Sequence, residues 1–220
     1  MVQPGPAASQ VWDILIREPL TGVAILDERG QRLWVNDQAV QIIRGPQGKA
    51  ADFLGKGIDD TMPAPFVKAL RPLLDRVRSG RKPLLVRSIW RGTQYVTWIH
   101  PLEPSPETVP DGRLLLITRP ANTDELKRYT AHRDVDVHHV EVIELGPLDV
   151  LTRRELEILA LIGQGMSLPD IATLLGRSPK TVEKHREAIG RKLGANDRLA
   201  LAEMAQRAGL SLADAERERI

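Results

Sequence analysis

Apolar residues recur at helical spacing between residues 151 and 210, and capping residues show where each helix begins. The segment Thr152-Arg153-Arg154-Glu155 has the capping-box pattern, in which the threonine and glutamate side chains each accept from a free backbone N–H group. Three further helix starts are marked by short polar side chains: Ser167, Ser178, and Asn196 or Asp197. Glycines stand where the first three helices should end: Gly165, Gly176 and Gly194. The pattern predicts a compact all-α domain of four short helices.

The third of these helices begins at Pro179 and has two distinct faces. One face should pack against the domain's own core and consists of Val182, His185, Ile189 and Leu193. The opposite face is charged and consists of Lys180, Glu183, Lys184, Glu187 and Arg191. A turn of about three residues separates this helix from the second one, as in a helix-turn-helix whose second helix enters the major groove of DNA. A charged face that is merely solvated is the alternative. Because the helix, turn and cap signals coincide, we favour the interpretation that this face binds DNA.

Residues 22 to 119 show a different pattern, in which short apolar runs alternate with turns. Apolar runs that predict strands occur at 23–26, 33–35, 84–90, 95–100 and 114–118. The first two flank a turn that ends in Gly30 and so form a predicted hairpin. Asn36 should cap a short helix over 37–43, and an amphipathic helix should run from Phe66 to Gly80. Two strands, then helices, then three strands predict an α+β domain with an antiparallel sheet.

Composition narrows the classes of function. The chain has 220 residues, of which 42% are hydrophobic, and this suits two small domains. It has no apolar run long enough to cross a membrane, and MVQPGPAASQ lacks a secretory pattern, so we expect a cytoplasmic protein that does not bind membranes. The absence of cysteine excludes disulfides, thiol nucleophiles and cysteine-ligated metals. We find no nucleophile–base pair, phosphate-binding glycine loop or metal cluster, and expect no enzyme activity.

The net charge of +2 is too small to indicate a polyanionic partner, but charge is distributed unevenly. Residues 122–149 hold three basic residues against seven acidic ones, and residues 177–198 hold seven basic against three acidic. We expect the acidic segment to be a solvated linker that relays rotation or spacing and also shields the basic helix. Its histidines His138 and His139, with His132, are read as polar surface rather than as a metal site.

The stretch LTRRELEILALIGQGMSLPDIATLLGRSPKTVEKHREAIGRKLGANDRLAL resembles the LuxR-type DNA-binding domain, also called FixJ/NarL-type. The matching positions include Thr152, Glu155, Gly165, Ile171, Val182, Ile189, Lys192, Gly194 and Arg198. The resemblance implies that the helix from Pro179 is the recognition helix and that the fourth helix forms a dimer contact. We expect contacts to double-stranded DNA from Lys180, Thr181, Glu183, Lys184, Arg186, Glu187, Arg191 and Lys192. Dimer contacts are expected from Leu199, Leu201, Ala202, Met204 and Ala205.

Within this set, Glu183, Lys184 and Glu187 occupy the positions that the resemblance places toward the bases. A carboxylate can accept from cytosine N4 and a lysine can donate to guanine, so a half-site that contains G·C pairs is expected. The alternative is that Glu187 pairs with Arg191 and only orients it. The other basic residues of the set are expected to contact phosphates.

The segment GVAILDERGQRLWVNDQAV and the strand–helix–strand order are similar to a PAS sensor domain. The resemblance implies a ligand cavity, for which Trp34, Trp90 and Trp98 are the candidate lining, and a small apolar or aromatic ligand. Haem is disfavoured because the only histidine of the domain, His100, stands on a strand, and covalent flavin is excluded because the chain has no cysteine. An N-terminal helix that contains Trp12 would pair protomers or cover the sheet. A domain that only dimerises remains the alternative to a sensor.

The predicted organisation has five parts: an N-terminal helical extension (1–21), a PAS-like sensor domain (22–119), a linker with a helix (120–147), a LuxR-type domain (148–212) and a C-terminal tail (213–220). We expect a homodimeric transcriptional regulator that binds an inverted-repeat operator and contacts RNA polymerase. Two alternatives stay open: an autoinducer receptor of the acyl-homoserine-lactone type, and a protein–protein signalling adaptor whose helix-turn-helix no longer binds DNA.

Overall fold

A computed structural model describes residues 8–104, 112–131, 137–195 and 197–220. The chain divides into two compact units, each described below by itself. Unit 1 comprises Met1–Val86 and Val96–Arg119, and unit 2 comprises Arg87–Tyr95 and Pro120–Ile220. The division falls inside two neighbouring strands, so both strands run from one unit into the other.

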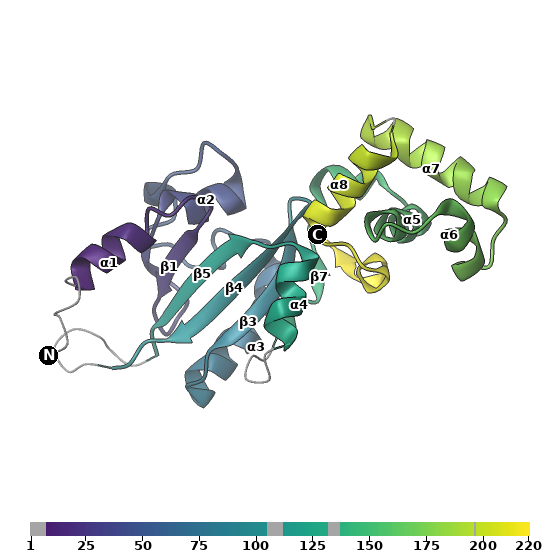
Figure 1. Cartoon of the computed structure of the whole chain (residues 1–220). Helices are drawn as coiled ribbons and strands as arrows, with labels where there is room; N and C mark the ends of the chain where they lie inside the picture. The colour runs from purple at the N-terminus through teal and green to yellow at the C-terminus, as the bar shows by residue number, and fades with distance from the viewer. Residues whose placement is uncertain (1–7, 105–111, 132–136, 196) are drawn as a thin grey trace, which may run out of the picture. The chain divides into compact units, whose positions relative to one another are not determined.

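Unit 1 is built on an antiparallel sheet with helices (Figure 1). Its elements in chain order are α1 (Ala8–Leu15), β1 (Gly22–Leu26), β2 (Arg32–Val35), α2 (Asp37–Arg44), the 3-10 turn η1 (Ala50–Asp52), α3 (Ala64–Gly80), β3 (Leu84–Trp90), β4 (Thr93–Pro101) and β5 (Leu114–Pro120). The strand order is β2-β1-β5-β4-β3-β6, in which the last strand, β6 (Val137–His139), belongs to unit 2, and β1 pairs antiparallel with both β2 and β5. Every strand and both main helices predicted for this region are present, with bounds that shift by one or two residues.

The core of unit 1 includes buried residues of β1 and β5. Leu26 and Leu114, which are paired across β1 and β5, are fully buried, as is Phe53. Asn36 caps α2 as predicted, since its Oδ1 accepts from the Ala39 N–H at 2.9 Å. Its Nδ2 also donates to the carbonyl oxygens of Ile16 and Thr21, so the same side chain ties the preceding segment to the sheet.

Unit 2 is mainly helical. Its elements after β5 are α4 (Thr123–Ala131), β6 (Val137–His139), β7 (Val142–Ile143), the 3-10 helix η2 (Gly146–Val150), α5 (Arg153–Gly163), α6 (Leu168–Leu174), α7 (Pro179–Leu193), α8 (Arg198–Ala208), the 3-10 helix η3 (Leu212–Glu216) and β8 (Glu218–Arg219). The capping box at Thr152 and the caps at Ser167, Ser178 and Asp197 are formed as predicted, whereas Asn196 lies outside the described residues. The predicted fold class, an α+β domain followed by an all-α helix-turn-helix domain, is confirmed.

Two predicted boundaries differ from the structure. The second half of the expected linker is not solvated, because Val140, Val142, Ile143 and Leu145 are buried in unit 2. The expected C-terminal tail is also part of the fold of unit 2, because β8 pairs in parallel with β7 and Asp214 is fully buried. The helix expected at the start of the linker is present as α4. Across the described part of the chain, no helix is both long and apolar enough to span a bilayer.

Candidate nucleic-acid interface

Helix α7 is held at both ends and along one side. Ser178 Oγ accepts from the Thr181 backbone N–H at 3.1 Å, and Gly194 ends the helix in a left-handed conformation with φ of 66°. Val182 and Ile189 are fully buried in the core of unit 2, and Leu193 packs against that core. His185, on the same side, is half-buried. These contacts determine which side of α7 faces outward.

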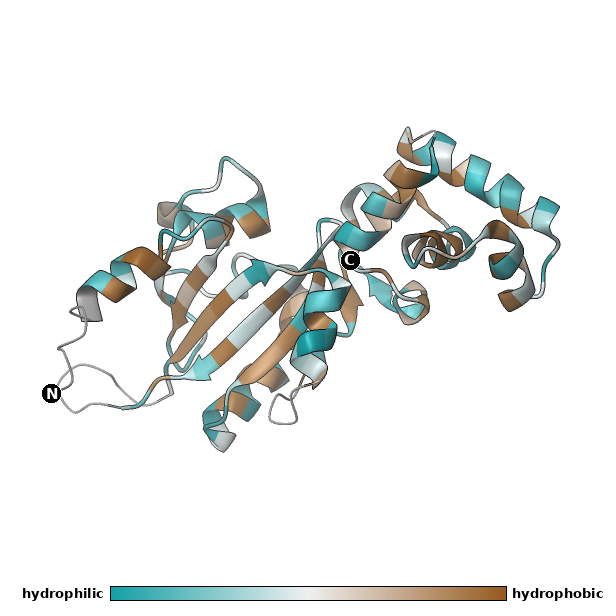
Figure 2. Cartoon of the chain, in the orientation of Figure 1, coloured by the Kyte–Doolittle hydropathy of each residue, from teal (hydrophilic) through white to brown (hydrophobic). Residues whose placement is uncertain are grey.

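The outward side of α7 presents charged side chains that have no partner among the described residues. Lys180, Lys184, Glu187 and Arg191 are exposed, and none of them forms an ion pair or side-chain hydrogen bond with another described residue. The Glu187–Arg191 pair that the spacing suggested is therefore not formed. Figure 2 shows the ribbon of α7 as mostly hydrophilic, whereas that of α5 is mostly hydrophobic. A polyanion can approach these cations without breaking an existing ion pair.

Four of the expected DNA contacts are already engaged inside the domain: Glu183, Arg186, Lys192, and Thr181, whose Oγ1 lies 2.8 Å from Ser178 Oγ. Arg186 Nη2 lies 2.8 Å from Glu183 Oε1, one turn earlier on the same helix. Lys192 Nζ donates to Glu155 Oε2 at 2.6 Å, and that glutamate is buried. Lys192 therefore acts as the counter-ion of a buried carboxylate, a role that the sequence pattern did not indicate. Its contact with phosphate stays a prediction, as do those of the other residues of the set.

The buried carboxylate of Glu155 is held ionised by its hydrogen bonds. Burial acts to raise the pKa of Glu155, but the hydrogen bonds from Lys192 and Thr152 outweigh burial and keep that pKa below its ordinary value. The Thr152 N–H donates to Glu155 Oε2 at 2.7 Å, so the same oxygen completes the capping box of α5 and pairs with α7. One carboxylate thus fixes the last turn of α7 to the start of α5.

Two arginines fix the turns on either side of α6. Arg154 Nη2 donates to the Leu175 carbonyl oxygen at 3.0 Å, where α6 ends. Arg198 Nη2 donates to the carbonyl oxygens of Gly165 and Met166 at 3.2 and 2.5 Å, before α6 begins. Both donors come from other helices. The helix–turn–helix geometry of α6 and α7 is therefore set by contacts to α5 and α8 as well as by local caps.

The expected dimer surface on α8 needs correction. Leu201 and Ala205 are 0% and 1% exposed and form part of unit 2's own core, so they are not available to a second protomer. Leu199 is 69% exposed. Ala202 and Met204 are half-buried. The stripe that the sequence suggested as one surface is divided between the core and the exterior, because a four-helix domain this small needs α8 to complete its interior.

The three tryptophans expected to line a ligand cavity are divided between the two units. Trp34 on β2 packs against Trp12 of α1, with ring centroids 5.4 Å apart. Trp98 on β4 stacks on His100 at 5.6 Å. Trp90 is buried and belongs to unit 2. The lining of one cavity by all three rings stays a prediction.

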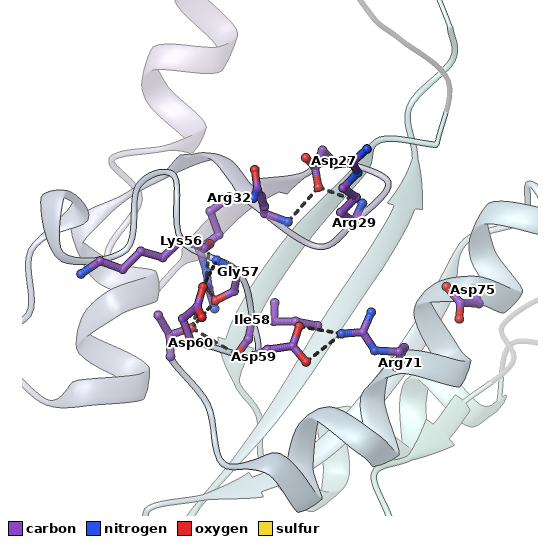
Figure 3. A network of polar contacts seen from close by, with 12 residues as sticks. Asp27, Arg29, Arg32, Lys56, Gly57, Ile58, Asp59, Asp60, Arg71 and Asp75 are labelled. Atoms are coloured by element: carbon purple, nitrogen blue, oxygen red, sulfur yellow. Dashed lines mark hydrogen bonds and ion pairs between the residues drawn. The ribbon is translucent and has the colours of Figure 1, made fainter.

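Sequence reasoning missed a buried arginine in unit 1. Arg32 is 4% exposed, and its Nη1 donates to Gly57 O at 3.0 Å and to Thr61 Oγ1 at 2.7 Å (Figure 3). Its guanidinium lies 4.6 Å from the centroid of the Phe53 ring. Burial lowers the pKa of Arg32 to about 10, although the nearby Asp60 acts in the opposite direction. Arg32 holds the loop before α3 against β2, and the loop's carbonyl groups give no recognisable sequence signal.

An open groove lies beside α3, near the paired side chains of Asp59 and Arg71 in Figure 3. Arg71 Nη2 donates to both carboxylate oxygens of Asp59, at 2.8 and 2.6 Å. The groove is lined by Asp59, Ala64, Val67, Lys68, Arg71, Pro72 and Asp75. Four of these seven side chains are charged, and the small apolar or aromatic ligand of unit 1 stays a prediction.

Two of the three histidines of the expected linker have described positions. His138 and His139 lie on β6, and His132 is outside the described residues. His139 Nδ1 is 3.5 Å from Arg87 Nη1, a cation that disfavours a metal ion at the same place. Among the residues with described positions, no three histidine, aspartate or glutamate side chains are grouped to hold a metal ion.

Residues 149–205 match the family described as bacterial regulatory proteins of the luxR family. The match contains α5, α6 and α7 and most of α8. The C-terminal helices are therefore a helix-turn-helix domain of the LuxR family, as the sequence resemblance implied.

Curated relatives share this part of the chain. The chain is 44% identical over 57 residues to the transcriptional regulatory protein UhpA of Escherichia coli strain K12, and the match covers 26% of this chain and 29% of UhpA. It is 37% identical over 106 residues to the oxygen regulatory protein NreC of Staphylococcus haemolyticus, covering 45% of this chain and 49% of NreC. The chain thus spans less than half the length of these relatives.

Two solved structures are similar over longer parts of the chain. VqmA of Vibrio cholerae, in a complex with ligand and DNA, aligns with a TM-score of 0.47 and 17% identity, covering 94% of this chain and 90% of VqmA. The PAS domain of the histidine kinase ThkA aligns with a TM-score of 0.36 and 15% identity, covering 45% of this chain and 97% of that domain.

Proposed function

We propose that this chain, whose residues 149–205 form a LuxR-family helix-turn-helix, is a sequence-specific DNA-binding regulator of transcription. One observation carries the proposal: on the outward side of α7, Lys180, Lys184 and Arg191 are exposed and unpaired with any described residue. Each phosphate that such a cation neutralises releases counter-ions, so binding of this helix in the major groove is favourable. The names of the relatives UhpA and NreC, both regulatory proteins, support the same role.

Within the groove, the side chains of α7 divide into two groups. Lys184 and Glu187 read bases, since the lysine donates to guanine O6 or N7 and the carboxylate accepts from cytosine N4. Lys180, Thr181 and Arg191 contact phosphates and fix the register. Glu183 is occupied by Arg186, so this pair either stays intact at the groove wall or opens to release Arg186 for a phosphate. Half-sites that contain G·C pairs follow from this arrangement.

A homodimer supplies the affinity that one small domain lacks, because two linked domains bind two half-sites with a shared effective concentration. Half-sites about 10 base pairs apart, or a multiple of that, fit two recognition helices on one face of the duplex. The exposed Leu199 on α8 is the first apolar candidate for the protomer contact. RNA polymerase is the expected downstream partner of the bound dimer.

Unit 1 receives the signal in this proposal. Its antiparallel sheet with flanking helices has the predicted PAS-like arrangement, and a small apolar or aromatic ligand stays the first candidate. A unit that serves only to pair protomers is the second. Native mass spectrometry of the purified chain distinguishes them, because it shows bound mass and subunit count together.

The proposal is tested by the capture of genomic DNA fragments followed by gel-shift assays. We expect the chain to retain a small set of fragments that share an inverted repeat, with an affinity that falls steeply as salt rises. The double variant Lys180→Met, Lys184→Met should lose this retention. Lys68→Met is the matched control, because Lys68 is an exposed lysine of unit 1 with no described partner.

If the chain is instead a signalling adaptor, it should retain no DNA fragment in the same experiment. Exposed Glu187, together with Glu183, places negative charge on the side of α7 that would meet phosphates. Failure of the unmodified chain to retain any fragment at low salt, while correctly folded, would overturn DNA binding and leave the adaptor standing.

A further inference from the structure

The tip of the β3–β4 hairpin, Arg87–Tyr95, folds as part of unit 2 although its strands begin and end in unit 1. Ile89 is fully buried and belongs to the same core cluster as Ile143, Leu145 and Leu148. That cluster also contains the buried residues of the helices of the LuxR-family domain. The Arg87 carbonyl oxygen accepts from the Val140 N–H at 3.0 Å, and the Ile89 carbonyl oxygen accepts from the Glu144 N–H at 3.1 Å. The hairpin is thus a structural component of the DNA-binding unit.

A buried ion pair joins the same hairpin to the segment after α8. Arg87 donates from Nη1 and Nη2 to the two carboxylate oxygens of Asp214, at 2.8 and 2.9 Å. The Arg87 and Asp214 side chains are 4% and 0% exposed. Arg87 Nη2 also donates to the Gly209 carbonyl oxygen at 2.7 Å, and Arg87 Nε donates to Gln94 Oε1 at 2.5 Å. The guanidinium therefore connects both strands of the hairpin to the C-terminal end of α8.

Among the described residues that pair with Asp214, Arg87 is the most deeply buried cation. Ser211 N–H and Ser211 Oγ donate to its Oδ2 at 2.8 and 2.7 Å, and Arg217 lies 3.3 Å from its Oδ1. Removing the Arg87 charge from a buried carboxylate is costly, because the remaining charge is left without its main partner. The hairpin and η3 are therefore stable together, and each is weakened without the other.

The turn of the hairpin is fitted to the segment before η2 by close backbone approach. A side chain on Gly92 would come within 2.8 Å of the Leu145 carbonyl oxygen, and one on Gly146 would come within 2.8 Å of the Arg91 carbonyl carbon. Glu144 adds a polar clamp, since its carboxylate accepts from the backbone N–H groups of Arg91 and Gly146. Only a backbone without Cβ atoms at both positions permits this contact.

From these contacts we propose that the β3–β4 hairpin, held by the Arg87–Asp214 pair, couples the stability of unit 1 to that of the DNA-binding helices. The coupling itself does not depend on the function proposed above. Its role in signalling rests on that function: a signal received by unit 1 would reach α8 through the two continuous strands. The sequence pattern predicts instead that residues 120–147 relay rotation or spacing between the two domains. An event that orders the sheet stabilises the hairpin, and the hairpin supplies Arg87 and Ile89 to unit 2.

The test measures amide hydrogen exchange in the full-length chain without DNA. Val40→Ala loosens the core of unit 1, where Val40 is fully buried on α2, far along the chain from the hairpin. We expect Val40→Ala to raise exchange in unit 1 and also, by at least about threefold, at residues 209–215. Arg87→Lys keeps a charge but loses the bidentate contact, and in that background the effect of Val40→Ala at residues 209–215 should disappear.

Arg71→Lys is the control, because Arg71 also donates to both carboxylate oxygens of an aspartate, Asp59, but from Nη2 alone and in an exposed pair within unit 1. In the Arg71→Lys background the response of residues 209–215 to Val40→Ala should be unchanged. The proposal is overturned if Val40→Ala alters exchange in unit 1 alone, or if its effect on residues 209–215 is the same with Arg87→Lys. No DNA enters the measurement, so this result and that of the fragment-capture experiment can each fail separately.

Discussion

The carboxylate of Glu155 shows how one side chain serves both the helix start of α5 and the position of α7. It accepts from the Thr152 N–H and from Lys192 Nζ while it is buried. Because its pKa in the folded chain lies below the ordinary value, the ionised form contributes stability at pH values above about 4. That contribution is lost as the pH falls through the folded-state pKa.

Substitution of this residue should therefore change both stability and its pH dependence. We expect Glu155→Gln to lower the free energy of unfolding by about 1–3 kcal/mol at pH 7, because Lys192 loses its charged acceptor. The difference between the variant and the unmodified chain should shrink as the pH falls from about 5 towards 2. Urea unfolding at a series of pH values measures this. A difference that stays constant over that range would show that the carboxylate's charge is not the source of the stability.

The Glu183–Arg186 pair gives a prediction for DNA affinity. Glu183→Gln removes a carboxylate from the outward region of α7 and leaves Arg186 without its ionic partner. We expect tighter binding to a random-sequence duplex and a log–log salt slope that is steeper by about 0.9, the value for one added phosphate contact. Fluorescence anisotropy between 50 and 200 mM salt, a range of about fourfold, measures the slope. An unchanged slope would mean that Arg186 does not reach the backbone.

At the residue scale, what the sequence could predict depends on distance along the chain. The Thr152–Glu155 capping box was predictable because its partners are three residues apart, with a spacing that helices impose. The partner of the same carboxylate on α7, Lys192, is 37 residues away, and its role emerges only from tertiary structure. Arg32 and Arg87 were missed for the same reason, since most of their acceptors lie on distant segments.

Among the elements, the packing of α5 on α8 depends on Gly163, the last residue of α5. A Cβ atom at this position would lie 2.6 Å from the Ala205 Cβ on α8. We expect Gly163→Ala to push the helices apart and to cost about 1–3 kcal/mol of stability. Gly80→Ala at the end of α3 is the control, because a Cβ atom there has no neighbour within 4 Å, and it should change stability by less than about 1 kcal/mol. Thermal unfolding that ranks the two variants in the reverse order would contradict this account.

The longer elements were predictable and the shortest were not. Caps and apolar periodicity predicted α5 to α8 because both signals are local and strong. The two-residue strands β7 and β8 carry no periodicity, and they pair only because distant parts of the chain meet, at Val142–Glu218 and Ile143–Arg219. The apolar stripe of α8 was recognised, but its division between core and exterior required the packing of the other three helices.

At the scale of the whole molecule, the proposed dimer depends on apolar surface that each protomer leaves exposed. Leu199 on α8 is 69% exposed, and Leu54 in unit 1 is 54% exposed. We expect Leu199→Asp to shift the protein towards monomers and to weaken operator binding more than tenfold, a loss of about 1.4 kcal/mol or more. Leu54→Asp, the matched control, should change neither. Sedimentation at several concentrations gives the subunit count, and a Leu199→Asp protein that stays dimeric would remove α8 from the interface.

The predicted domains are continuous segments of the chain, whereas each unit of the structure combines two separate segments. Acidic composition suggested that residues 122–149 are a solvated linker, yet the apolar residues interspersed with those acids, such as Val140 and Ile143, are buried. Net charge over a window does not show which side of a strand each residue occupies. The division between units also crosses β3 and β4, whereas sequence reasoning divides a chain only between elements.

The integration of the hairpin has a consequence for recombinant exchange of regulatory modules. The segment recognised as LuxR-like ends at residue 205, whereas Gly209, Asp214 and β8 complete the fold around it and receive Arg87 from more than a hundred positions upstream. A graft of the corresponding segment from a LuxR-family protein in place of residues 149–205 would have to match Ile89 and Ile143 at its inner surface. The unit that could be exchanged is therefore larger than the LuxR-like segment, because it includes the hairpin tip and residues 206–220.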